Sequence, residues 1–120
     1  MIMKDSDSER DHRISMEILV DCYDEGEEAM GWYYYLQDNL SFPFIALCIE
    51  TRAISPLQVG EEVQVLEMAP ERECEHGEMF VFIRYGKKKL AVPLVQLEPV
   101  EADDKTVEAV LDWHYWNDHG

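Results

Sequence analysis

Acidic side chains are the residues of this sequence with the most chemistry to offer, and they are unevenly distributed. The 120 residues include 26 Asp and Glu but only 10 Lys and Arg, which gives a formal net charge of −16. Residues 14–51 contain no Lys or Arg and carry eight acids: Glu17, Asp21, Asp24, Glu25, Glu27, Glu28, Asp38 and Glu50. Carboxylate, amide and carbonyl oxygens are the ligands of calcium and other hard divalent cations. The segment therefore favours a cation site, although a solvated acidic face would have the same composition.

Asp38 is the acid for which the sequence gives the most specific reason. It falls at the C-terminal end of a predicted helix, where unpaired carbonyl oxygens and the negative end of the helix dipole gather. A carboxylate there is unfavourable by about 0.3–1 kcal/mol without a partner, and no Lys or Arg is near in the sequence. A bound cation would turn Asp38, the side-chain oxygen of Asn39 and nearby backbone carbonyls into a ligand set. Without a cation, Asp38 is an exposed acid that merely ends a helix.

The sequence also offers other acids as ligands and allows other kinds of metal site. Two groups of acids could complete it or form a weaker second one, and they are Glu71, Glu73 and Glu75 in the middle of the chain and Asp103 with Asp104 near its end. Spacing excludes an EF-hand, because a loop starting at Asp21 would place Tyr23 and Trp32 where oxygen ligands are needed. Zinc is a weaker alternative, since Cys74 and His76 would need two further Cys or His ligands.

The charge and the missing motifs argue against several function classes. Phosphate binding needs clustered Lys and Arg, so a net charge of −16 argues against nucleic acid and also disfavours anionic membranes. No apolar run approaches about 18 residues, and the N-terminus lacks the apolar core of a secretion signal, so we expect a cytoplasmic protein. The three cysteines cannot all pair and are expected to be free thiols. No hydrolase or kinase motif is present, and we expect no enzyme activity.

Hydrophobic periodicity predicts the elements that would position these acids. Asp24 followed by Glu27 is a capping-box pattern, and the apolar face that follows predicts a helix to about Asn39. Residues 14–23 fit either a strand or a helix, and we favour the helix. Short β-branched and aromatic segments between turn signals predict strands at 44–51, 62–67, 78–85 and 89–92. A closing segment at 92–97 resembles the strand pattern of small SH3-like barrels.

These elements predict an α+β fold. Residues 1–13 are expected to be a mobile polar arm, and residues 14–120 a single calcium-binding domain. Within this domain we expect a helical part at 14–40, a small SH3-like antiparallel β-barrel at 44–98 and a C-terminal helix at 103–117.

Three segments resemble a known family. The sequence MGWYYYLQDNL at 30–40 with FPF at 42–44, the segment 13–23 and the segment 92–97 resemble small acidic calcium-binding proteins of cyanobacteria, the CcbP family. The resemblance implies a calcium binder without an EF-hand that sequesters free cytosolic calcium. In filamentous members it implies a role in calcium signalling during heterocyst differentiation. It also implies that Asp38 matches the family's key aspartate, which follows the aromatic helix.

The sequence therefore predicts a calcium-buffering protein whose ligand is Ca²⁺ and whose principal carboxylate is Asp38. The alternative is an acidic SH3-like interaction module without a specific metal site, which would use its charge only for solubility. A protein partner or a protease acting on the chain is possible under either prediction, and the sequence does not identify one.

Overall fold

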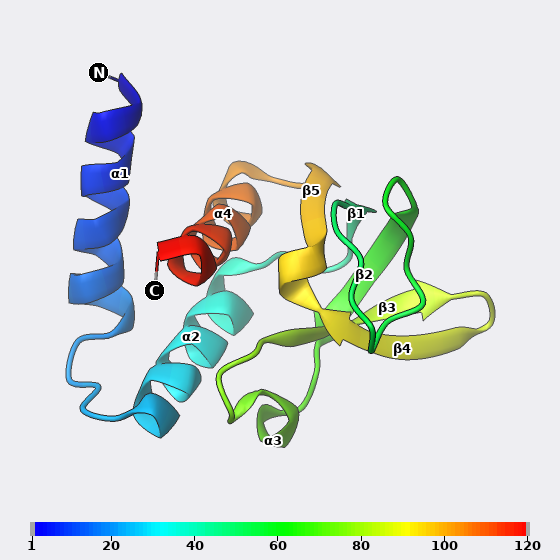
Figure 1. Cartoon of the computed structure of the whole chain (residues 1–120), viewed down its shortest axis with the longest axis horizontal. Helices are drawn as coiled ribbons and strands as arrows, with labels where there is room; N and C mark the ends of the chain where they lie inside the picture. The colour runs from blue at the N-terminus through cyan, green and yellow to red at the C-terminus, as the bar shows by residue number, and fades with distance from the viewer. Residues whose placement is uncertain (1, 120) are drawn as a thin grey trace.

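A computed structural model describes the backbone of residues 2–119 and the side chains of residues 8–118. Its long helices gather on one side of the molecule and its sheet on the other, and a short helix lies at the lower edge in Figure 1. The elements follow in the order α1 (Ile2–Arg13), η1 (Ile14–Ile18), α2 (Glu25–Asn39), β1 (Phe44–Cys48), β2 (Glu62–Met68), α3 (Glu71–Cys74), β3 (Phe80–Tyr85), β4 (Lys88–Pro93), η2 (Leu94–Gln96), β5 (Leu97–Glu101) and α4 (Asp104–His119). The α+β fold class is confirmed.

The five strands form one antiparallel sheet in the order β4-β3-β2-β1-β5. Val65 lies opposite Phe44 on β1 and opposite Ile83 on β3, and all three side chains are buried. The alternation of buried and more exposed positions along β1 and β3 follows from the two-residue period of a strand. Among the described strands, the edge strands β4 and β5 do not pair with each other, so the expected barrel is present as an open sheet. The 3-10 turn η2 joins them, at the place where a closing strand was expected.

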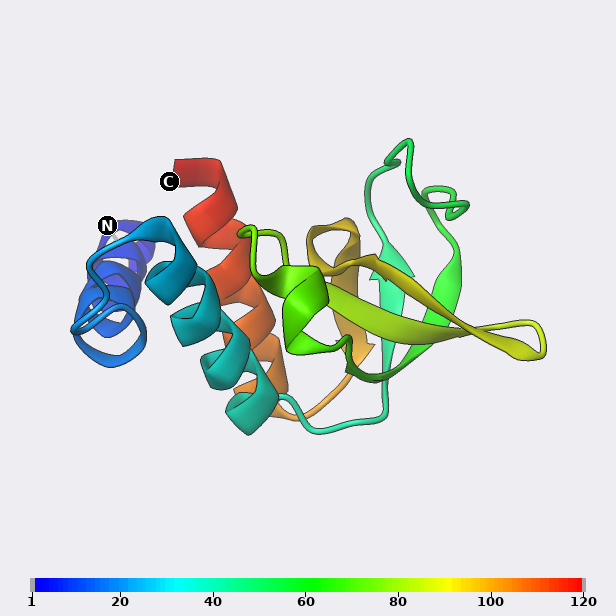
Figure 2. The same cartoon turned by 90° about the horizontal axis from the view of Figure 1, so that it is seen from below.

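Helices α2 and α4 pack together at the helical side of the core (Figure 2). Trp32 of α2 is buried against Trp113 of α4, with ring centroids 5.1 Å apart in an edge-to-face arrangement. The Tyr33 hydroxyl donates to the carbonyl of Ala69 at 2.7 Å, which ties α2 to the end of β2. These contacts fix α2, the helix that carries Asp38, relative to both α4 and the sheet.

A buried carboxylate, Asp112, connects the first helix to the rest of the molecule. Asp112 is 0% exposed, and Arg13 donates to its two oxygens at 3.0 and 2.7 Å. Arg10 Nε lies 2.9 Å from the same side chain, and the Tyr35 hydroxyl donates to it at 2.7 Å. The hydrogen bond to Asp112 raises the pKa of Arg13. The segment 1–13, expected to be a mobile arm, is thus helical from Ile2 and held at its last turn by ion pairs.

Other differences from the expected elements are local. In the ambiguous segment 14–23, only Ile14–Ile18 is helical, as a single turn of π-helix, and the helix ends at Leu19. The short helix α3 was not predicted, because its four residues are too few to show a period. On α4, Leu111 is 37% exposed, whereas its charged neighbour Asp112 is buried. Within the described residues, no helix combines the length and the hydropathy that crossing a membrane requires.

Candidate metal site

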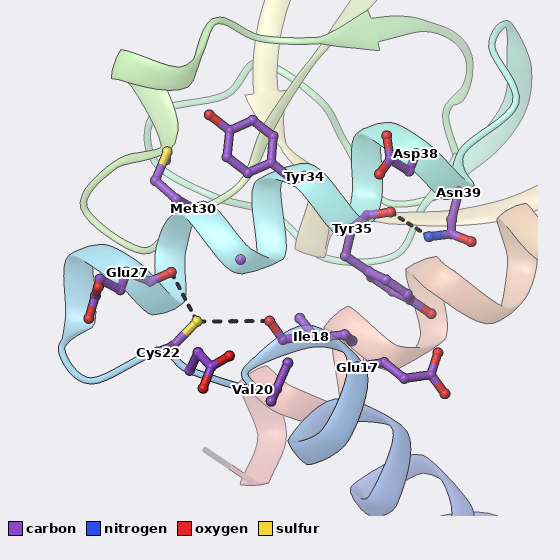
Figure 3. Close-up of a pocket in the computed structure, with 12 residues that line it drawn as sticks. Glu17, Ile18, Val20, Cys22, Glu27, Met30, Tyr34, Tyr35, Asp38 and Asn39 are labelled. Carbon is purple, nitrogen blue, oxygen red and sulfur yellow. Dashed lines mark hydrogen bonds between the residues drawn. The ribbon is translucent and has the colours of Figure 1, made fainter.

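An open groove of about 510 Å³ lies between η1 and α2 (Figure 3). Four carboxylates line it: Glu17, Asp21, Glu27 and Asp38. The side chain of Asn39 and the apolar residues Ile18, Val20, Met30 and Tyr34 also contribute to the lining, which includes no Lys or Arg. The groove is therefore a negatively charged channel with a partly apolar floor, formed by the chain segment that the sequence singled out for its lack of cations.

Local structure at the start of α2 positions one end of the groove. The Asp24 side chain accepts from the backbone N–H of Glu27 at 2.8 Å, as the predicted capping box requires. The Glu27 side chain reaches back to the N–H of Tyr23 at 2.8 Å, one residue before its usual target. Asp21 has a left-handed backbone, with φ of 63°, a conformation that Asp tolerates better than most residues. The turn it makes brings η1 back along α2.

Gly31 allows η1 to approach α2 closely. A Cβ atom at this position would lie 2.7 Å from the carbonyl oxygen of Ile18 and 3.2 Å from Cys22 Sγ. Both contacts are shorter than van der Waals separation, so any larger residue would push η1 away. A glycine inside a helix is unfavourable by about 1 kcal/mol relative to alanine, and this contact supplies the reason for its presence here.

Asp38 and Asn39 form the other end of the groove, at the last turn of α2. The Asn39 amide nitrogen donates to the carbonyl of Tyr35 at 2.7 Å, so its side-chain oxygen points away from the helix axis (Figure 3). Asp38 is exposed, and the last turn of α2 contains no basic residue. The structure therefore brings these two predicted ligands to one place, with the helix end unneutralised as the sequence indicated.

The thiol of Cys22 lies in the groove lining, close to several acids. Burial, followed by the charges of Glu27, Glu28, Asp21 and Asp24, raises the pKa of this thiol. The Cys22 thiol also donates to the carbonyl oxygens of Glu27 and Ile18, at 3.4 and 3.9 Å. The smaller, charge-dependent part of this pKa shift comes from acids at the same end of the groove.

The remaining predicted acids lie outside the groove. Glu71 and Glu73 are on α3 and Glu75 follows it, all exposed; the Tyr34 hydroxyl donates to Glu71 at 2.9 Å. Asp103 caps α4 by accepting from the N–H of Thr106 at 2.8 Å. Hydrogen bonds from the side chain of Thr106, and then from its backbone, lower the pKa of Asp103. Asp104 is the exposed first residue of α4. The structure thus gives Asp103 a capping role and does not place these acids with Asp38 and Asn39 in the groove lining.

The donors in the groove suit calcium better than zinc. Within the described part of the chain, no three His, Cys, Asp or Glu side chains are close enough together to hold one metal ion. Calcium accepts six to eight oxygen ligands that include carbonyls and water, so it needs few carboxylates, whereas structural zinc needs four Cys or His side chains. The alternative zinc ligand Cys74 is buried, burial raises the pKa of its thiol, and its sulfur accepts from the N–H of Phe80 at 3.3 Å.

Sequence reasoning missed three groove acids as site residues, Glu17, Asp21 and Glu27. The sequence shows the acids, but their grouping depends on how η1 folds back on α2. Gly31 was the available signal, because a glycine within an aromatic helix indicates a close backbone approach.

Comparisons with known proteins identify the family of this chain. A family model described as calcium binding, that of the CcbP family, matches residues 12–117. The crystal structure of CcbP from Anabaena is similar, with a TM-score of 0.79 and 40% identity over 92% of this chain and 89% of that one. A structure described as a calcium binding protein in the calcium-binding form has a TM-score of 0.80 and 41% identity, over 94% of this chain and 92% of that one. No curated protein matches the sequence significantly.

The chain belongs to the CcbP family of calcium-binding proteins. The resemblance stated from the aromatic segment is thereby confirmed, and Ca²⁺ is the ligand that the family supports.

Proposed function

We propose that this protein buffers cytosolic Ca²⁺ by binding it in the groove between η1 and α2. The observation that supports the proposal is the composition of the groove: four carboxylates and an outward-facing amide oxygen line it, and no Lys or Arg does. Asp38 and Asn39 would hold the ion, with Glu17, the acid that η1 contributes to the lining, on the facing side and with backbone carbonyls and water completing the ligands. The bound ion supplies charge neutralisation at the end of α2 and no reaction chemistry, so the function is binding rather than catalysis.

Sparse side-chain ligation bears on how tightly the ion would be held. A site with few carboxylates and a large share of water holds calcium less tightly than a rigid cage of charged ligands, since affinity rises with ligand charge and rigidity. We propose that the protein in this way limits free calcium in the cytoplasm, and that in filamentous cyanobacteria release from it contributes to signalling during heterocyst differentiation. The acids Glu71, Glu73, Glu75 and Asp104 remain candidates for a weaker second site.

Calorimetric titration of metal-free protein with CaCl₂ in excess Mg²⁺ tests the proposal. We expect heat of binding, and we expect Asp38→Asn to weaken it by about tenfold or more, because a charged ligand is lost. Glu98→Gln and Asp118→Asn are matched controls, because each removes one charge from an exposed position outside the groove, and they should leave the affinity nearly unchanged. Binding without an effect of Asp38→Asn would move the site elsewhere, and absence of binding would refute a calcium buffer.

The cellular part of the proposal has its own test. Free calcium is measured with a reporter in a cyanobacterial filament that expresses either the wild-type chain or Asp38→Asn at equal level. The wild-type chain should lower the resting signal and delay heterocyst formation, and the variant should do neither. Equal effects of both chains would show that the phenotype does not depend on calcium binding in the groove.

A further inference from the structure

Large apolar side chains are exposed around the groove, which calcium binding does not require. Met16, Val20, Tyr23 and Tyr34 are 57, 49, 84 and 46% exposed. Val20 and Tyr34 line the groove, and Met16 and Tyr23 adjoin the lining residues Glu17 and Cys22 in sequence. Methionine and aromatic side chains are enriched where proteins bind other proteins. A surface that combines apolar side chains with carboxylates suits a partner surface rich in Lys or Arg, because the aliphatic part of these side chains can pack on the apolar residues while the charge meets a carboxylate.

The same chain carries a surface of that kind at its other end. Residues 79–97 contain Arg84, Lys87, Lys88 and Lys89 and no Asp or Glu, the reverse of the segment 14–51. The four basic residues lie on the β3–β4 hairpin, where Lys88 pairs in register with Tyr85, which is 40% exposed. Lys89 is paired with Glu67 of β2 at 2.6 Å, so the exposed Lys87 and Lys88 supply the charge for a contact. Lysine side chains present long apolar stems below the charge, so they suit an acidic groove with an apolar floor.

The β3–β4 hairpin cannot reach the groove of its own molecule. Its tip extends away from the helices in both views, while the groove lies among the helices (Figures 1 and 2). We infer that the groove between η1 and α2 docks the β3–β4 hairpin of a second copy of this chain. Because the two surfaces differ, the contact is head-to-tail and continues from copy to copy.

Net charge opposes association but does not forbid it. The molecule is 40 Å long, whereas charges separated by more than about 8 Å are largely screened at physiological salt. The charges that matter are those near the contact, where Lys87 and Lys88 of one copy meet Glu17 and Asp38 of the next. The contact is weak, forms at high protein concentration and dissociates in salt.

Calcium and the hairpin compete for the same carboxylates, a consequence that rests on the proposed function. Calcium in the groove removes the charge that attracts the hairpin, so calcium dissociates the assemblies. By thermodynamic linkage, assembly lowers the calcium affinity by the same factor. A concentrated pool of the protein would therefore release calcium as it assembles.

Charge exchange tests the docking in the metal-free protein. Sedimentation velocity in EDTA at low salt should show self-association of the wild type, and K87E/K88E or E17K/D38K should each weaken it by about tenfold or more, because each pairs like charges. An equimolar mixture of these two variants restores opposite charges at every contact and should associate again. R72E/K105E is the matched control, because it changes the net charge as K87E/K88E does but leaves the hairpin intact, and it should associate like the wild type. Circular dichroism of each variant verifies folding.

The outcomes separate this inference from the proposed function. A wild type that stays monomeric at all concentrations, a mixture that fails to associate, or a control that loses association would each overturn the docking. Association in EDTA that CaCl₂ does not reverse would leave the docking intact and show that calcium binds elsewhere. Calcium binding by a strictly monomeric wild type would leave the proposed function intact and refute the docking.

Discussion

The buried carboxylate of Asp112 gives the sharpest prediction about stability. Asp112→Asn keeps the shape of the side chain and removes its charge. Three groups now converge on this carboxylate: Arg13 with hydrogen bonds of 3.0 and 2.7 Å, Arg10 at 2.9 Å and the Tyr35 hydroxyl at 2.7 Å. After the substitution, two guanidinium groups would face each other across a neutral amide.

The expected magnitude follows from the burial of the partners. Removing one member of a buried ion pair destabilises a protein by about 3–5 kcal/mol, because the other charge is left without a partner. The arginine side chains are 21 and 20% exposed, so water relieves part of the penalty and we expect about 3 kcal/mol. Since small domains have a total stability of about 5–15 kcal/mol, this is a large fraction. For a chain of this size it corresponds to a fall of about 10 °C in Tm.

Urea unfolding followed by circular dichroism measures the effect. Asp118→Asn is the control, because it removes the same charge from an exposed position on α4 and should change stability by less than about 0.5 kcal/mol. Arg13→Met should cost at least about 1 kcal/mol less in the Asp112→Asn background than in the wild type, because the two residues are in contact. Faster amide exchange in α1 should accompany either substitution. An Asp112→Asn variant as stable as the control, or additive effects in the double variant, would refute this reasoning.

Three further predictions concern the groove and its supporting helix. Gly31→Ala should destabilise by about 1–3 kcal/mol despite the better helix propensity of alanine, because the new Cβ would overlap the Ile18 carbonyl; a gain of stability in urea would show that η1 yields freely. Asp24→Ala should cost about 1 kcal/mol in the same assay by removing the helix cap, and Asp24→Asn, which still caps, should restore most of it. Burial, and then the hydrogen bond to Asp112, raises the pKa of Tyr35 above its ordinary value of 10.0. The unfolded chain therefore loses this proton first, and stability is full below pH 10 and falls as the pH rises above it. Tyr35→Phe should be less stable at neutral pH but show a shallower fall of the urea midpoint above pH 10, and parallel curves would contradict the assignment.

How far the sequence predicts this fold depends on how local each signal is. Helix α2 was predicted from its cap to its last residue, because a capping box and a 3.6-residue apolar period are both contained within the segment. The segment 14–23 fits both a two-residue and a 3.6-residue apolar period, so its sequence does not decide between strand and helix. Its structure depends on contacts with α2 at Gly31, and a pattern within the segment does not specify those contacts. The end of β1 at Cys48 and the short helix α3 similarly depend on neighbours distant in sequence.

The residues of the candidate site also differ in whether a local pattern identifies them. Asp38 and Asn39 could be identified because the reason, a carboxylate at the negative end of a helix, lies within a single element. Glu17 and Asp21 could not, because their position relative to Asp38 depends on the turn between η1 and α2. The burial of Asp112 was missed for a related reason. A charged residue is buried only where partners compensate its charge, so its burial can be predicted only when those partners are known. Here the partners, Arg10 and Arg13, are about a hundred residues away in the sequence.

The tryptophans give the helical half of this molecule an optical signal of its own. All three tryptophans of the chain meet at the α2–α4 junction, where the Trp32 ring centroid lies 5.1 Å from that of Trp113 and 6.1 Å from that of Trp116. Tryptophan emission therefore reports on the packing of α2 against α4, whereas the strands, whose aromatic residues are Phe and Tyr, contribute no tryptophan signal. Comparison with far-ultraviolet dichroism would show, without any label, whether the helices and the strands unfold together.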